Sequence, residues 1–433
     1  MTCTECTCAA LMNNAIAWNC IADNNTCQLI SNNSLDISQF EWMTNASCFF
    51  QKLPPAFLLT TTSTSISTTL TSTSTSTAST SASTSTSTSA STSTSTSAST
   101  STSTSASTST TSTSTTTTNI AAQWNSTAVT VAGSAGGTSG LTASLLSFPY
   151  ILRLDSSNAL YISDYGNNRI QKWILGDLNG TTIAGLANGT AGTSLNTLKS
   201  PVGLALDSND NMYVVDKLNS RVTFWPNGAS SGSVVAGTGT AGSGNNQLNR
   251  PNAIELVEST GTLYISDVSN YRIIQYLSNA SSGTVVAGGN GEGLGITQLY
   301  SPFGFTFDSS TNSLVIADYY ANHVVRWVLG ASNWILLAGS LGGTSGNSAT
   351  LLHNPVAVAL DQYGNLYVSD TGNHRIQFFL AGQSSGTTLA GVNGSPGTSA
   401  TQLNQPYGIL LDSQLNLYVA DYNNNRVQKF SRY

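Results

Sequence analysis

The sequence predicts an all-β fold for the C-terminal part of the chain, a closed six-bladed β-propeller of four-stranded antiparallel blades. Three observations lead to this prediction. A unit of about 51 residues recurs six times between Pro149 and the C-terminus. Each unit contains four short apolar runs separated by turn residues, and the two ends of the array each supply part of one blade. Self-similarity at such a period is typical of a repeat architecture.

The repeat is defined by three positions. Each copy opens on a proline, and successive prolines are 52, 50, 51, 53 and 51 residues apart. A short apolar run then ends on an aspartate, and five residues further on stands an arginine, or a histidine in the fourth copy. The opening prolines are Pro149, Pro201, Pro251, Pro302, Pro355 and Pro406. The paired positions are Asp164 and Arg169, Asp216 and Arg221, Asp267 and Arg272, Asp318 and His323, Asp370 and Arg375, and Asp421 and Arg426.

The unit that opens at Pro355 illustrates the strand pattern. Its runs at 356–360, 366–369, 375–380 and 387–390 are rich in β-branched and aromatic residues and are bounded by Gly, Asn, Asp and Ser. Such runs predict strands, and a helical period is absent from the repeat region of the sequence. Four short antiparallel strands per unit make one propeller blade.

The ends of the array predict how the ring closes. The sixth unit stops after its third run, while an unassigned run at 128–133 precedes the first proline. If the strand 128–133 completes the last blade, six blades result and every strand edge is paired, which avoids an exposed edge. The alternative is an open array with a frayed edge.

These motifs resemble the NHL repeat. The resemblance rests on Pro201-Val-Gly-Leu-Ala-Leu-Asp207 and on Tyr367-Val-Ser-Asp-Thr-Gly-Asn-His-Arg-Ile376, and it covers all six units. It implies a six-bladed propeller, in agreement with the closure argument. The departures are Val257 in place of the first aspartate, Val315 in place of the tyrosine, and His323 in place of the arginine.

The repeated Asp–Arg positions are interpreted as structural pairs. A charged pair that recurs in every blade is expected to orient a turn and to bridge neighbouring segments, because a catalytic residue is not needed six times around a ring. Substitution of one pair should therefore lower stability and leave any specific activity in place.

The first part of the chain predicts two further segments, so that the proposed domains are 1–55, 56–120 and 121–433. Residues 60–118 are almost purely Ser and Thr with scattered Ala, a composition that cannot bury a core. We expect either a mucin-like stalk with O-linked glycans or an unmodified flexible linker.

All six cysteines lie in residues 1–55, at Cys3, Cys6, Cys8, Cys20, Cys27 and Cys48. An even number in a short loop-rich segment predicts a disulfide framework of unknown connectivity, and a zinc site is the alternative. The stretch from Cys8 through Cys27-Gln-Leu-Ile30 resembles part of a PAN/apple module, which implies an extracellular binding unit.

Several features predict an extracellular or cell-surface location. Asn-x-Ser/Thr sequons occur at Asn24, Asn32, Asn45, Asn125, Asn179, Asn188 and Asn279. The start of the sequence lacks the basic and apolar regions of a signal peptide, so we expect the targeting signal or anchor to be missing from this chain. No apolar stretch approaches the roughly 20 residues of a membrane span.

Composition argues against nucleic-acid binding. Only 8% of the residues are charged, and the chain carries a formal net charge of −6. A basic stripe able to neutralise phosphates is missing from this sequence. No cofactor is expected.

The innermost strand of each unit is predicted to line the central channel with small residues. Arg153 and Glu255 are the polar exceptions. They are an orienting pair in a channel pocket, or else a partly solvated ion pair or two unrelated charges at the channel mouth. The three histidines, His323, His353 and His374, occupy turn positions that do not obviously converge on the axis.

The sequence thus favours a non-enzymatic extracellular interaction scaffold that binds protein or glycan partners through the loop face of the propeller. The alternative is a metal-dependent hydrolase or lyase that acts in the channel, a function found in related six-bladed folds.

Overall fold

The computed structural model describes residues 21–23, 26–28 and 124–433. The chain divides into two compact units, Met1–Thr110 and Thr111–Tyr433. In the first unit, β1 (Ile21–Asp23) and β2 (Thr26–Gln28) form an antiparallel pair. The predicted linker and five of the six cysteines lie outside the described residues, and Cys27 falls in β2, whose side chains are not described. The PAN/apple-like module and its disulfides therefore stay predictions.

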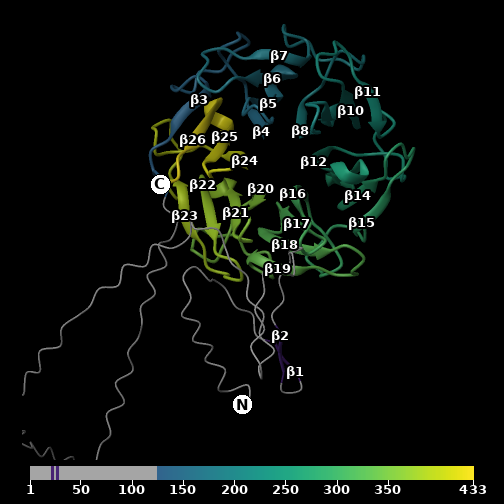
Figure 1. The fold of residues 1–433 in the computed structure, drawn as a ribbon, viewed down its shortest axis with the longest axis vertical. Helices are drawn as coiled ribbons and strands as arrows, with labels where there is room; N and C mark the ends of the chain where they lie inside the picture. The colour runs from purple at the N-terminus through teal and green to yellow at the C-terminus, as the bar shows by residue number, and fades with distance from the viewer. Residues whose placement is uncertain (1–20, 24–25, 29–123) are drawn as a thin grey trace, which may run out of the picture. The chain divides into compact units, whose positions relative to one another are not determined.

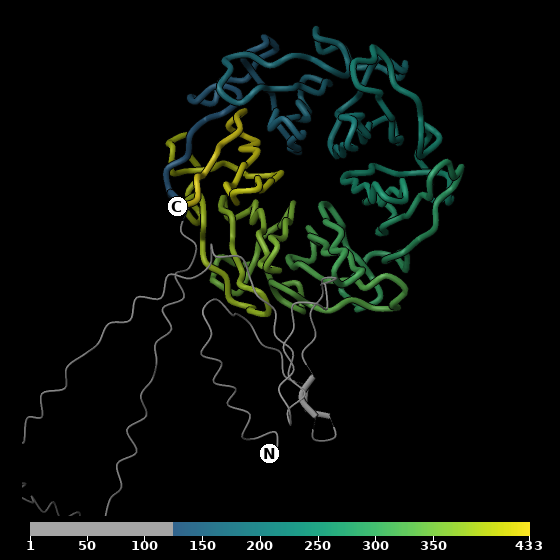
Figure 2. The backbone as a smooth tube through the Cα atoms, viewed as in Figure 1, coloured from purple at the N-terminus to yellow at the C-terminus, as the bar shows by residue number. Residues whose placement is uncertain are grey.

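The second unit is a six-bladed propeller of four-stranded antiparallel sheets, which confirms the predicted fold class. Figures 1 and 2 show the blades in chain order around one axis. The innermost strands are β4 (Pro149–Leu154), β8 (Pro201–Leu206), β12 (Pro251–Val257), β16 (Pro302–Asp308), β20 (Pro355–Leu360) and β24 (Pro406–Leu411). The second strands are β5 (Leu160–Asp164), β9 (Met212–Asp216), β13 (Thr262–Asp267), β17 (Ser313–Asp318), β21 (Leu366–Asp370) and β25 (Leu417–Asp421).

The outer half of each blade follows the same order. The third strands are β6 (Arg169–Trp173), β10 (Arg221–Trp225), β14 (Arg272–Tyr276), β18 (His323–Val328), β22 (Arg375–Phe379) and β26 (Arg426–Phe430). The outermost strands are β7 (Thr181–Gly185), β11 (Ser233–Ala236), β15 (Thr284–Gly288), β19 (Ile335–Gly339), β23 (Thr387–Gly391) and β3 (Val129–Gly133). Each repeat proline begins an innermost strand, and each motif aspartate ends a second strand.

The ring closes through a strand from the N-terminal side of the propeller. β3 pairs antiparallel with β26, with Gly133 opposite Arg426 and Ala132 opposite Val427, so blue and yellow strands lie side by side in Figure 1. The strand begins one residue later than the predicted 128–133, because the Ala128 N–H donates instead to the carbonyl of Ala400 at 2.8 Å. Both ends of the propeller are thereby held in the sixth blade.

Small residues let the innermost strands converge on the axis. At the second residue after the proline, blades two, four and six have glycine, at Gly203, Gly304 and Gly408. A Cβ atom at these three positions would lie 2.3–2.5 Å from a backbone carbonyl oxygen of the next innermost strand. Blades one, three and five have a side chain there, so the strands approach closely only because every second one lacks a Cβ.

Antiparallel pairing gives the propeller two distinct faces. We call turn face the one that carries the turns between second and third strands and the loops that lead from a fourth strand to the next proline. The opposite face carries the other two sets of turns. Five of the six turns between second and third strands are short 3-10 helices, which the sequence pattern did not predict: η4 (Tyr165–Asn167), η5 (Lys217–Asn219), η7 (Val268–Asn270), η8 (Thr371–Asn373) and η9 (Tyr422–Asn424). In the part of the chain that the structure describes, no helix is long and apolar enough to cross a membrane.

Candidate functional site

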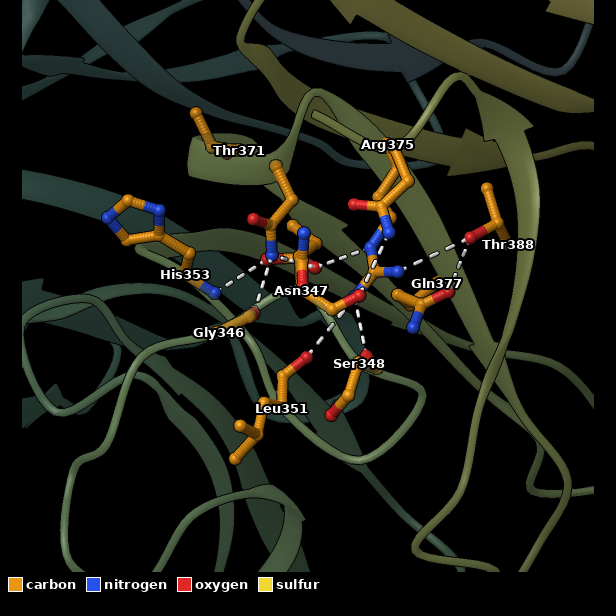
Figure 3. Close-up of polar contacts among 12 residues, drawn as sticks. Gly346, Asn347, Ser348, Leu351, His353, Thr371, Arg375, Gln377 and Thr388 are labelled. Atoms are coloured by element: carbon orange, nitrogen blue, oxygen red, sulfur yellow. Dashed lines mark hydrogen bonds and ion pairs between the residues drawn. The ribbon is translucent and has the colours of Figure 1, made fainter. Parts of the chain in front are cut away.

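The repeated Asp–Arg pairs form a buried latch on the turn face, shown for blade five in Figure 3. One oxygen of Asp370 accepts the backbone N–H of His353 at 2.7 Å, and the other accepts Asn373 Nδ2 at 2.8 Å and Arg375 Nε at 2.7 Å. Arg375 Nη2 then donates to the carbonyls of Ser348 and Leu351 in the preceding loop. Burial raises the pKa of the Asp370 carboxyl, although these donors oppose the shift.

The same latch recurs in five blades. The Nε–Oδ2 distance is 2.7–2.8 Å for Asp164 with Arg169, Asp216 with Arg221, Asp267 with Arg272, Asp370 with Arg375, and Asp421 with Arg426. In each, the arginine donates to carbonyls of the loop that leads into its own blade. The structure therefore places these residues in a scaffold that fixes the loops of the turn face.

Blade four replaces the latch with a different set of contacts. His323 Nε2 lies 3.7 Å from Asp318, and Ala321 stands where the other blades have the latch asparagine. The indole N–H of Trp334 donates to the carbonyl of Gln298 at 2.8 Å. This carbonyl is four residues before the proline, as are those of Leu145 and Leu351 that arginine binds elsewhere. A tryptophan thus takes over one of the hydrogen bonds of the missing arginine.

A second contact staples neighbouring blades together. Asn168, in the left-handed conformation at φ 54°, accepts the backbone N–H of Ser200 just before the next proline. Asn322 and Asn425 make the equivalent bond, and Asn425 thereby joins blade six to blade one. His374 does the same through Nδ1, which accepts the Gln405 N–H at 3.1 Å. This role requires an unprotonated Nδ1, and burial, with His353 nearby, lowers the pKa of His374.

The channel brings together the two polar residues that the sequence singled out. Arg153 on β4 and Glu255 on β12 form an ion pair at 3.1 Å between blades one and three, and each side chain is 24% exposed. Burial raises the pKa of Glu255, and Arg153 opposes that shift. The hollow that they line has a volume of about 30 Å³. That space suits one or two water molecules and is far below the several hundred Å³ of a small-molecule site.

The turn-face mouth of the channel holds a polar group that sequence reasoning missed. The hydroxyl of Tyr150 donates to Asn252 Oδ1 at 2.7 Å, which connects blade one to blade three across the axis. Both side chains are buried. Lys217 Nζ donates to the same oxygen at 3.0 Å and lies 5.5 Å from the ring centre of Tyr150 and 5.4 Å from that of Phe303. Burial lowers the pKa of Lys217 to about 8, and the Arg250 cation adds to the shift.

Aromatic rings surround this mouth on the side of blades six and one. We call Tyr150, Tyr165, Tyr407 and Tyr422 the aromatic platform. Tyr407 and Tyr422 stack at 4.1 Å, and Tyr150 lies 4.9 Å from Tyr407 and 5.6 Å from Tyr165 between ring centres. All except Tyr150 are partly exposed. The residues of the mouth come from two positions of the repeat, the one after the proline and the one after the motif aspartate. A comparison of these two positions between the six units could have located the mouth from the sequence.

Charge is divided unequally between the faces. Of the Lys and Arg side chains in 124–433, all but Lys199, Lys217, Arg250 and Arg432 take part in an ion pair. Lys199, Lys217 and Arg250 lie on the turn face of blades two and three. Apart from the latch aspartates, Glu292 is the one acidic residue in the turns and loops of that face. The opposite face carries Asp155, Asp177, Asp207, Asp210, Glu258, Asp308, Asp361 and Asp412, and Glu255 lies in the channel.

The three histidines do not come together in one cluster. Within residues 124–433 and the described hairpin, no group of three or more His, Cys, Asp or Glu side chains is placed to hold a metal. His323 is buried in blade four, whereas His353 and His374 both lie at the turn face of blade five. Among the predicted glycosylation sites, Asn125, Asn179, Asn188 and Asn279 are exposed, and Asn24, Asn32 and Asn45 lie outside the described residues.

A larger groove lies away from the axis. Its volume is about 480 Å³, and Trp124, Phe378, Thr388 and Leu389 are among its lining residues. Trp124 packs on Tyr367 and Phe378 there, with ring centres 5.8 and 5.5 Å away, and so helps to hold the closing segment. None of its lining residues has a charged side chain, and Trp124 of the segment that leads into β3 forms part of its wall.

Comparison with known proteins agrees with the repeat and the fold. The family model for the NHL repeat matches residues 352–379 and 403–430, which are in blades five and six. The chain carries NHL repeats in a six-bladed propeller. A curated relative, the chloroplastic protein SUPPRESSOR OF QUENCHING 1 of Arabidopsis thaliana, is 28% identical over 334 residues. The match covers 66% of this chain and 30% of the relative, so the chain spans about a third of that protein's length.

Solved structures show the same fold at low sequence identity. A structural genomics protein of unknown function from Bacteroides thetaiotaomicron has a TM-score of 0.53 at 16% identity, over 71% of this chain and 76% of that chain. An auxiliary nutrient binding protein from the same organism has a TM-score of 0.53 at 17% identity, over 71% and 76%. These likenesses concern the propeller scaffold alone.

Proposed function

We propose that this protein is a non-enzymatic extracellular interaction scaffold that binds a protein or glycan partner on the turn face of its propeller. The observation that carries the proposal is the mouth of the channel on that face. It combines a partly exposed aromatic platform with Lys217, a largely desolvated cation. Aromatic rings beside a few fixed polar groups are the usual make-up of a binding site.

The latches support this proposal because they hold the surrounding loops without using exposed side chains. Each arginine of the five latches is buried and bonded to loop carbonyls, so the loops are fixed from below. Loops on a rigid scaffold are where binding surfaces are usually found. The exposed sequons and the composition of the N-terminal segments support the extracellular location.

The competing function is a hydrolase or lyase that acts in the channel. Arg153 and Glu255 are the residues that such an enzyme would use, but they bind each other in a hollow of about 30 Å³. A substrate would have to separate this pair and widen the channel. We therefore favour binding at the turn face.

The test is a binding screen with matched variants of the full chain. The immobilised protein is exposed to a glycan array and to a panel of extracellular protein domains. Tyr422→Ala on the turn face should weaken the retained interaction, whereas Asp177→Ala, an exposed change on the opposite face, should leave it intact. Circular dichroism and thermal melting of both variants control for folding.

Two results would overturn the proposal. One is a retained partner whose binding is insensitive to turn-face variants and sensitive to opposite-face variants. The other is turnover on an ester or lactone panel that depends on added metal and is lost in Glu255→Gln, which would favour the enzyme instead.

A further inference from the structure

Lys217 is a cation without an acidic partner at the centre of the turn face. Among the described residues, no carboxylate lies within ion-pair distance of its ammonium group, and the charge that acts on it most is another cation, Arg250. Its contacts are one amide oxygen and the faces of two aromatic rings. Withdrawing a charge from water without a counter-ion is costly, and an anionic group placed beside it would remove that cost.

A hydrogen bond and two aromatic rings hold the ammonium group of Lys217 at the mouth of the channel. Asn252 Oδ1 accepts both the Tyr150 hydroxyl and the lysine, and Asn252 Nδ2 donates to the carbonyl of Phe303 at 2.9 Å. The amide is thus fixed by three hydrogen bonds from three other blades. Because the hydrogen bond to Asn252 uses one N–H of the Lys217 ammonium group, its other N–H groups can bind a ligand.

The charge of the face limits the kind of anion. Lys199 and Arg250, both exposed, are the nearest unpaired cations by position, and together with Lys217 they give three positive charges on blades two and three. This number is too small for a polyphosphate chain, whose binding depends on many simultaneous phosphate contacts. It suits a ligand with one or two carboxylates.

The aromatic platform indicates what carries the carboxylate. Tyr165, Tyr407 and Tyr422 are partly exposed and lie next to Tyr150, whose ring also contacts the lysine. Tyrosine offers a flat apolar face and a hydroxyl at its edge, a combination that suits a ligand with alternating apolar and polar edges. The C–H face of a sugar ring stacks on such a surface while its hydroxyls reach the tyrosine edges.

We infer that the ligand is an acidic saccharide, whose carboxylate binds Lys217 while its sugar ring lies on the aromatic platform. This inference rests on the proposed function in its glycan form and names the class of glycan.

The test compares an oligogalacturonate with the same oligomer fully methyl-esterified, which keeps the ring and lacks the charge. Binding to the full-length protein is measured by isothermal titration calorimetry or surface plasmon resonance. The charged oligomer should bind the wild type at least about 10-fold more tightly than the ester, the effect of one charged hydrogen bond. Lys217→Met should abolish that preference.

The matched control is Lys429→Met. Lys429 is also a partly exposed lysine, but it lies on the opposite face, 3.9 Å from Asp412. The Lys429→Met variant should retain wild-type affinity for the charged oligomer. The Lys217→Arg variant should bind this oligomer about as tightly as the wild type, because the positive charge is preserved.

The pH dependence provides a second readout. In the protein without ligand, the pKa of Lys217 is lowered to about 8. A galacturonate carboxylate is ionised at every pH between 7 and 9.5. Wild-type affinity should therefore decline from pH 7 to pH 9.5 as Lys217 loses its proton, whereas Lys217→Arg should lose little. The other groups that act on the amine are the Arg250 cation and Tyr150, whose pKa is raised by burial well above its usual value.

The outcomes separate this inference from the proposed function. Equal binding of acid and ester, with Tyr422→Ala impaired, would refute the role of Lys217 and keep a glycan site on the turn face. Retention of a protein domain but of no saccharide would refute the inference and keep the scaffold. An acid preference that survives Lys217→Met would also refute it, whatever the effect of Tyr422→Ala.

Discussion

The two faces of the propeller use charge in opposite ways. On the turn face, the motif carboxylates and guanidinium groups are buried and bonded to one another and to loop carbonyls. On the opposite face, carboxylates such as Asp361 lie in exposed turns, where they accept the N–H groups of Tyr363 and Asn365. The first arrangement fixes long loops to the scaffold, whereas the second closes short turns and forms ion pairs with side chains of the third strands.

This difference separates the part that is constant between repeats from the part that varies. The latch lies beneath the loops, so the residues at the mouth can change from blade to blade without loss of the fold. After the proline, for example, the chain has Tyr150 in blade one, Val202 in blade two and Asn252 in blade three. The turn face can therefore acquire a ligand site while its framework is kept.

The largest effect is expected from breaking a latch. Arg375→Met leaves the Asp370 carboxylate buried without its cation and should reduce the free energy of unfolding by about 3–5 kcal/mol. Arg326→Met removes a partly exposed ion pair of 3.3 Å with Asp308 on the opposite face, and should lose only about 1 kcal/mol or less. Denaturant titrations followed by tryptophan fluorescence measure both. Equal losses would show that the faces do not differ in this way.

Blade four offers a rescue experiment. His323→Arg alone should destabilise by about 1–3 kcal/mol, because the ring of Trp334, 5.0 Å from that of His323, crowds the longer side chain. Adding Ala321→Asn and Trp334→Gly supplies the residue types of the other latches and should recover most of that loss. The three changes should be strongly non-additive in thermal melting. Additive losses would mean that Trp334 does not replace the arginine.

A smaller effect is expected in the turns of the opposite face. Asp361→Ala removes an acceptor for two backbone N–H groups, for the Asn365 amide and for the Tyr367 hydroxyl, and should reduce stability by about 1–2 kcal/mol. Asp177→Ala, in an exposed turn of the same face in blade one, is the control and should stay within about 0.5 kcal/mol of the wild type. A loss at Asp361 as large as that at Arg375 would remove the contrast between the faces.

The smallest effect concerns pH and the staple of blade five. The pKa of His374 is lower in the folded than in the unfolded state, so its contribution to stability is present above the unfolded pKa of about 6.5 and is lost as pH falls through the folded value. His374→Asn supplies the acceptor that Asn168 and Asn425 use, and should make stability less sensitive to acid between pH 7 and 5. Melting temperatures across this range test the prediction, and unchanged sensitivity would contradict it.

The sequence predicted the propeller scaffold well because the same motif recurs in six units, with only a few substitutions. The five-residue spacing of Asp370 and Arg375 predicted that the two residues form a pair, and the structure places them opposite each other at the start of a strand pair, 2.7 Å apart. The spacing could not show that the arginine reaches loop carbonyls some 25 residues earlier, because loop conformation leaves no periodic pattern. Glycine stands at the position of Trp334 in blades one, two, three and five, so comparing this position between repeats would have located the exchange: it is occupied by Gly180, Gly232, Gly283 and Gly386.

The mouth of the channel was harder to predict because its residues differ between blades. Tyr150, Lys217 and Asn252 come from three blades and converge only once the ring has closed. Arg153 and Glu255 stood out in the sequence as charges among small apolar residues, and the structure places them in contact. Lys217 and the tyrosines did not stand out, since lysine and tyrosine are ordinary residues in surface turns.

Hydrogen–deuterium exchange of the full-length protein, with and without oligogalacturonate, tests most directly whether the turn face is the binding surface. We expect new protection in η4, η5 and η9 and in the residues around Pro149, Pro251 and Pro406, with little change on the opposite face. Protection confined to the turns that carry Asp361 and Asp412, or to the strands around Arg153 and Glu255, would contradict this expectation.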